Sequence, residues 1–180
     1  RSSKYFYNSM SYISKTVFRL FMKDEYYYSG PRLLLRETGS FLTVIYLEET
    51  IFSNRSLYSI KIKVNRFYPK YVLACLNSKA LQYYYSLKFK SETELFPKIR
   101  IKQAKQMPIP IAELDEQIRI NNVIDEIITL KRANQSNDTS TLESEIDRLV
   151  YHLYGLTYDE VLIVDPETSI TREEYEMRQI

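Results

Sequence analysis

Four basic side chains recur at short intervals in one segment of the chain and could bind phosphate. The segment reads FPKIRIKQAKQMPIPI, and its cations are Lys98, Arg100, Lys102 and Lys105. No acidic residue stands among them. Ammonium and guanidinium groups at such spacing attract phosphate oxygens without reading a base sequence. The segment, called the basic stripe below, therefore predicts contact with a polyanion backbone.

Two turns rich in hydrogen-bond donors could carry a different chemistry, the reading of base edges. An arginine can bridge the O6 and N7 atoms of guanine, and an asparagine can pair with N6 and N7 of adenine. A single such residue is as often only a solvated charge, whereas the whole set favours a surface that reads DNA. The candidates are Arg32, Arg36, Thr38 and Ser40 around the turn RETGS, and Ser53, Asn54 and Arg55 in the turn SNR.

The distribution of charge agrees with a polyanion partner for the first part of the chain. Residues 1–110 hold 19 Lys and Arg against 7 Asp and Glu, a balance of +12. Residues 111–180 hold 6 against 16, a balance of −10, so the net charge of +2 conceals a strong asymmetry. Such a split favours nucleic acid as the partner of the basic part. Chance segregation of surface charges is the less favoured explanation.

The residue types that most enzymes need are scarce. Cys75 and His152 are the only residues of their types, which argues against a multi-ligand metal site. The three glycines stand far apart, so no phosphate-binding or cofactor loop is present. The sequence also contains neither an acid-x-Lys pair nor an asparagine-proline-proline-aromatic motif. We expect no catalytic site and no cofactor in this chain, and the hypothesis of a small enzyme is disfavoured.

The elements that would position these residues are short strands followed by a helix. Apolar runs between breakers predict strands, and Pro69 is suited to the first turn of a helix in which Cys75 is a buried apolar residue. The many tyrosines are expected mainly in the core. We predict a helix around Ser14–Met22, a helix from Pro69 through Tyr84, and strands at Leu33–Arg36, Phe41–Tyr46, Thr50–Phe52, Tyr58–Lys63 and Lys98–Ile101.

Beyond the prolines Pro108 and Pro110 the pattern becomes helical. Apolar residues from Leu114 to Ala133 predict one helix, and the spacing of Leu142, Ile146, Leu149 and Leu153 predicts a second that forms a hairpin with it. Ser140 with Glu143, and Thr157 with Glu160, are capping boxes. The first helix carries extra apolar residues at Ile120 and Val123–Ile124. We expect this surplus face to need a partner surface.

Four segments together resemble a known family. They are RLLLRETGSFL, YVLACLNSKALQYYY, FPKIRIKQAKQMPIPI and the hairpin from LDEQIRINN to LVYHLYGLTYDEV. In this order and spacing, over about residues 31–164, the chain resembles the TaqI-like C-terminal specificity domain of type IIG restriction-modification enzymes, which is related to type I specificity subunits. The aromatic opening from Tyr5 to Tyr28 lies outside the resemblance.

The resemblance implies a DNA target recognition domain followed by a helical spacer. We expect an α+β fold with a mixed sheet at residues 1–110, a two-helix spacer at 111–156 and a short helical tail at 157–180. S-adenosylmethionine and Mg²⁺ would then belong to methyltransferase and nuclease domains, fused or separate, and the location would be cytoplasmic. The alternative is an interaction module that docks a protein partner through its acidic hairpin.

Overall fold

The computed structural model describes residues 24–53, 56–89 and 97–177. The predicted helix Ser14–Met22 and the candidate residues Asn54 and Arg55 lie outside these ranges. Statements about the structure below refer to the described residues.

The short apolar runs of the first half form a three-stranded sheet. Its strands are β1 (Arg32–Arg36), β2 (Val44–Leu47) and β3 (Leu57–Ile60), in the order β2-β1-β3. The central strand β1 is apolar on both faces because both faces are covered, as the burial of Leu33, Leu34 and Leu35 shows. The α+β class is confirmed. Both pairings in the described sheet are antiparallel, so the expected mixture of pairings is not seen there.

Three of the predicted strands differ from the structure for identifiable reasons. β2 begins only at Val44 because the side chain of Gln82 occupies both backbone groups of Leu42. The segment predicted as a strand at Thr50–Phe52 belongs to no strand of the sheet, and the N–H of Ile51 donates to the carbonyl of Tyr28 at 3.1 Å. The strand predicted at Lys98–Ile101 is a single bridge, after which helix α4 (Ile101–Ala104) begins.

A short 3₁₀ helix covers the end of the sheet at which β3 finishes. This helix, η1 (Glu25–Tyr28), is held by the hydroxyl of Ser59, which donates to the carbonyl of Tyr27 at 2.5 Å. The ammonium group of Lys61 donates to the carbonyl of Ser29 and lies 5.0 Å from the ring centroid of Tyr26. Ser59 and Lys61 therefore hold the segment that precedes the sheet in place.

The helix predicted from Pro69 is two helices, α2 (Pro69–Asn77) and α3 (Lys79–Phe89). The break lies at the buried Ser78, whose hydroxyl donates to the carbonyl of Cys75 at 2.7 Å. The carboxylate of Asp147, 68 residues further along the chain, accepts the backbone N–H of Lys79 at 2.8 Å. The hydroxyl of Ser78 also accepts the backbone N–H of Leu81 at 3.3 Å, so a local cap and a tertiary contact together begin the second helix.

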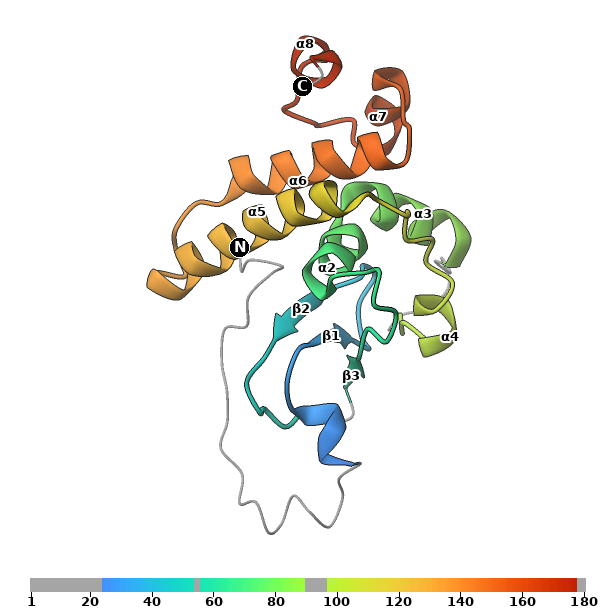
Figure 1. The fold of residues 1–180 in the computed structure, drawn as a ribbon. Helices are drawn as coiled ribbons and strands as arrows, with labels where there is room; N and C mark the ends of the chain where they lie inside the picture. The colour runs from blue at the N-terminus through green and yellow to red at the C-terminus, as the bar shows by residue number, and fades with distance from the viewer. Residues whose placement is uncertain (1–23, 54–55, 90–96, 178–180) are drawn as a thin grey trace.

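Helix α2 lies between the sheet and the helical hairpin formed by α5 (Leu114–Ala133) and α6 (Ser140–Leu153) (Figure 1). One side of α2 contacts β1 and β2, and another contacts α5 and α6. Buried residues from Leu33 to Val150 accordingly form one apolar cluster. Sheet and hairpin share a core, and the domain boundary at residue 110 stays a prediction.

The expected surplus face of α5 was assigned incorrectly at Ile120 and Ile124. Ile120 is 1% exposed and Ile124 is fully buried, because α2 of the same chain covers this side of α5. Two apolar residues near the start of the helix are exposed instead, Leu114 at 56% and Ile118 at 41%. In α6 the deepest residues are Ile146, Val150 and Tyr151, so its buried face is rotated slightly from the predicted leucine seam.

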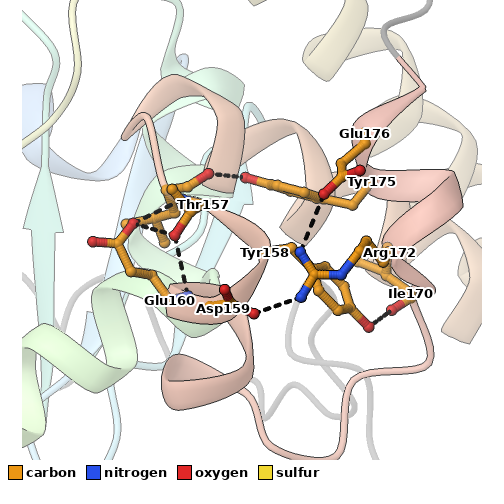
Figure 2. A network of polar contacts seen from close by, with 9 residues as sticks. Thr157, Tyr158, Asp159, Glu160, Ile170, Arg172, Tyr175 and Glu176 are labelled. Carbon is orange, nitrogen blue, oxygen red and sulfur yellow. Dashed lines mark hydrogen bonds and ion pairs between the residues drawn. The ribbon is translucent and has the colours of Figure 1, made fainter.

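The tail forms two further helices beyond α6, on the side away from the sheet (Figure 1). These are α7 (Tyr158–Val164) and α8 (Arg172–Glu176), and the predicted capping box between Thr157 and Glu160 is confirmed. Figure 2 shows Arg172 reaching both Asp159, at 2.5 Å, and Glu176, at 3.2 Å. Tyr151 of α6 shares a buried apolar cluster with Val161, Ile170 and Tyr175, so the tail is packed on α6 as well as bonded within itself.

No helix among the described residues is long and apolar enough to cross a membrane.

Candidate nucleic-acid interface

The first donor-rich turn and the basic stripe meet at one end of the sheet. Thr38 and Lys98 form an antiparallel bridge, in which the N–H of Gly39 donates to the carbonyl of Pro97 at 3.0 Å. The N–H of Ile99 donates to the carbonyl of Glu37 at 2.7 Å. The side chain of Ile99 is fully buried in the core. Two segments about 60 residues apart are therefore joined by backbone bonds and one apolar anchor.

The turn needs a glycine at the point where the two segments meet. Gly39 has φ of +148°, a backbone conformation that residues with a Cβ rarely adopt. Its N–H makes one of the two bonds to the stripe. The glycine that interrupted the apolar pattern of the sequence is thus required by the junction.

A pocket of about 370 Å³ opens at this junction. The turn and the start of the stripe form one part of its wall, and helices α3 and α4 with Gln106 beyond α4 form the rest. The lining residues are Gly39, Ser40, Tyr85, Phe89, Pro97, Lys98, Arg100, Lys102, Gln103 and Gln106. This pocket, called the basic pocket below, has three cations and no carboxylate among the described residues of its wall.

All four cations of the stripe are exposed, and none of them forms an ion pair within the described part of the chain. Cations elsewhere in the molecule do have acidic partners, for example Lys70 with Asp125 and Arg119 with Glu145. The backbone of Arg100 is held by the side chain of Gln103, which accepts its N–H at 2.7 Å. The stripe consequently presents positive charge that the described residues leave uncompensated.

The residue that precedes β3 is bonded to the first donor-rich turn. The N–H of Glu37 donates to the carbonyl of Ser56 at 2.8 Å, so the residue that follows β1 is bonded to the residue that precedes β3. Arg36 is exposed at the end of β1, and Ser53 is half-buried. Arg36, Thr38, Ser40 and the stripe therefore occupy one end of the sheet, and their contacts with bases or phosphates stay a prediction.

Arg32 does not belong to this group and is a correction to the set of base-reading candidates. Its side chain is fully buried at the opposite end of β1, roughly 13 Å away at about 3.3 Å per strand residue. The guanidinium donates to the carbonyls of Gly30, Glu49 and Ile51 at 2.8–3.0 Å. Burial lowers the pKa of this guanidinium, and Glu49 nearby opposes that shift. Arg32 holds two loops together and cannot reach a ligand.

Four residues of the pocket wall, Tyr85, Phe89, Gln103 and Gln106, were not predicted from the sequence. Tyr85 and Phe89 of α3 lie one helical turn apart, with ring centroids 5.7 Å from each other. Gln103 and Gln106 alternate with the lysines of the stripe. The periodicity of α3 indicated a helix that packs on the sheet, but no signal in the sequence placed its last turn beside the stripe.

Cys75 and His152, the residue types most often used in catalysis, both pack against other side chains of the fold. Burial raises the pKa of the Cys75 thiol to about 12, and the side chain is fully enclosed. His152 stacks on Tyr175 with ring centroids 4.2 Å apart. In the described ranges, no group of three or more His, Cys, Asp or Glu residues is arranged to hold a metal ion.

Comparison with known families gives one match. The family described as the TaqI-like C-terminal specificity domain matches residues 3–109, which is more than half of the chain. The match includes the aromatic opening that the sequence resemblance left out, and it ends before the helical hairpin that the resemblance included. No curated protein matches the chain.

Proposed function

Since the chain belongs to the family of TaqI-like C-terminal specificity domains, which recognise DNA sequences in restriction-modification, we propose that it binds duplex DNA at one end of its sheet. In this proposal Arg36, Thr38 and Ser40, with Ser53, Asn54 and Arg55 of the second turn, read base edges. Lys98, Arg100, Lys102 and Lys105 contact phosphates and set the position of the duplex.

One observation carries the proposal: the donor-rich turn and the basic stripe are joined to each other. The bridge between Thr38 and Lys98 puts the residue types that read bases next to those that bind phosphate. Sequence-specific DNA recognition requires both kinds of contact on one surface. The acidic second half lies over α2 and beyond it, on the side away from the strands (Figure 1).

We propose further that the chain performs no chemistry itself. Methyl transfer and cleavage would then come from catalytic domains in the same polypeptide or in a partner subunit, which would hold S-adenosylmethionine and Mg²⁺. The exposed apolar residues Leu114 and Ile118, with acidic Asp115 and Glu116 beside them, favour the start of α5 as the contact for such a domain. The same residues are what a pure interaction module would use, and that function is the second candidate.

The dependence of DNA affinity on salt tests the proposal. Phosphate binding releases counterions, so the logarithm of the association constant falls linearly with the logarithm of salt, by about 0.9 for each phosphate contacted. We expect a steep negative slope of log K against log salt for the unaltered chain. In Lys102→Gln the magnitude of this slope should be lower by about 1.

The matched control is Lys79→Gln, which removes the same charge from a lysine that is paired with Asp165 and distant from the stripe in the fold. Its slope should equal that of the unaltered chain. An interaction module with an incidental basic face would show weak binding and no difference between the two variants.

A further inference from the structure

We propose that the basic pocket holds a single nucleotide that has left the base stack of a DNA duplex. The inference rests on the proposed function, because it takes DNA as the ligand. It goes further by assigning a binding site for one unpaired base with its phosphate, in addition to contacts along the outside of the duplex.

The inner wall of the pocket is suited to a base. Tyr85 is buried and Phe89 is half-buried, and both line the cavity from the last turns of α3. Aromatic rings of this kind stack with bases of any sequence. Gln106 adds an amide group that can donate to and accept from the polar edge of a base, and the amide nitrogen of Gln103 can donate while its oxygen holds Arg100. A site for a bare phosphate would not need the aromatic side chains.

The outer wall is suited to the phosphate of the same nucleotide. Lys98, Arg100 and Lys102 are exposed along one side of the cavity, and the hydroxyl of Ser40 lies on its wall. None of these three cations is paired with a carboxylate of the described chain, so an incoming phosphate displaces no internal ion pair that the structure describes. The cations and the aromatic rings thus form the two halves of a nucleotide site.

The volume of the pocket suits one nucleotide and is too small for a duplex. A cavity of about 370 Å³ lies near the lower limit for small-ligand sites, roughly 300–1,000 Å³. A base pair stacked in a duplex cannot enter it, whereas one extruded nucleotide can. Extrusion requires unstacking, and it is least costly where the nucleotide is already unpaired.

Two duplexes test the proposal. One is fully paired, and the other has the same base pairs with a single additional, unpaired nucleotide in the centre of one strand. The affinity of the whole 180-residue chain for each duplex is measured by competition in fluorescence anisotropy. We expect the bulged duplex to bind at least about fivefold more tightly, as one stacked base gives. Gln106→Trp, which fills the cavity from an exposed position, should abolish this preference.

Two further variants separate stacking from shape. Phe89→Leu keeps an apolar side chain but removes the ring, and it should reduce the preference. Gln135→Trp places the same large side chain on the exposed loop between α5 and α6, and it should keep the full preference. A preference that survives Gln106→Trp would come from the bent shape of the bulged duplex and would overturn the proposal.

The remaining outcomes distinguish this inference from the proposed function. Equal affinity for the two duplexes at every salt concentration tested overturns the nucleotide site but does not contradict the DNA-binding function. Failure to bind either duplex contradicts both. Deoxyadenosine monophosphate is the final probe. Suppose that it binds the unaltered chain but not Gln106→Trp, while the two duplexes bind with equal affinity. The pocket then takes free nucleotides, and its assignment to DNA is wrong.

Discussion

Arg32 and Arg36 stand at the two ends of one strand, and their surroundings give them different roles. Arg32 has its guanidinium enclosed and bonded to three backbone carbonyls. Arg36 is exposed beside the turn that meets the basic stripe. The sequence could identify both as candidates, but it could not separate them, because the partners of Arg32 lie up to 19 residues away.

Substitution of each arginine should therefore affect a different property. Arg32→Gln should lower the free energy of unfolding by about 2–4 kcal/mol, since it removes charge-assisted bonds of a buried guanidinium and leaves three part-buried carbonyls without this donor. Chemical denaturation of the variant measures this loss. A change below about 0.5 kcal/mol, the usual range for surface positions, would contradict a structural role for Arg32.

Arg36→Ala should leave stability nearly unchanged and weaken discrimination at one base pair. The expected loss is about 1–3 kcal/mol if the contact with guanine is bidentate. Selection of binding sites from a pool of random duplexes, done with the variant and with the unaltered chain, reports the preference at each position. An unchanged preference at every position removes Arg36 from the reading surface.

At the scale of elements, the sequence predicted helices better than the contacts between them. The bounds of α5 and the capping box of α7 follow from local patterns that a single helix contains. The break between α2 and α3 involves Asp147 as well as the local serine Ser78, and the bridge at Lys98 depends on Thr38. Asp147 and Thr38 are the long-range partners. Neither partner is near in sequence, so periodicity and capping motifs could not indicate them.

The burial of α5 gives a prediction that separates folding from assembly. Ile120→Asp should lower the free energy of unfolding by about 3–5 kcal/mol, because it buries a carboxylate against α2. Ile118→Asp, at an exposed position of the same helix, should leave the fold intact. Thermal unfolding monitored by circular dichroism compares the two variants, and equal destabilisation would contradict the packing of α5 described above.

Ile118→Asp should nevertheless weaken association with a methyltransferase domain if the start of α5 contacts it. Sedimentation of the assembled enzyme carrying this substitution measures the effect. Normal assembly would show that the hairpin only supports the sheet, and would leave the contact with catalytic domains to another surface.

For the molecule as a whole, the tyrosines that the sequence indicated as core residues determine its response to alkali. Burial raises the pKa of Tyr71, Tyr151 and Tyr154 above the ordinary value of 10.0. The unfolded chain loses these protons first as pH rises, so it binds fewer protons than the folded chain and stability falls. Each such group contributes up to about 1.4 kcal/mol per pH unit above the ordinary pKa.

Denaturant titrations between pH 8 and pH 11 measure this effect. We expect the free energy of unfolding to be level up to about pH 9 and to decline steeply above pH 10. A stability that is independent of pH over this range would mean that the three phenol groups ionise as readily in the folded chain as in water.

The shared core predicts how the molecule responds to division. Because α2 lies between the sheet and the hairpin, a chain that ends at residue 110 exposes the apolar side of α2 that α5 covers. It should lose cooperative unfolding and bind a dye specific for exposed apolar surface. A cooperative transition in the shortened chain would instead support the boundary predicted from the sequence.

The most direct test of the central claim is the selection of binding sites by the unaltered chain from a pool of random duplexes at physiological salt. We expect enrichment of one short sequence, which the chain should bind at least about 10³-fold more tightly than an unrelated duplex, as specific recognition requires. Loss of this enrichment when the first donor-rich turn is altered at Arg36, Thr38 and Ser40 would place the reading surface at the end of the sheet. A pool that remains random after repeated selection, with binding that depends only on salt, would contradict sequence recognition by this chain.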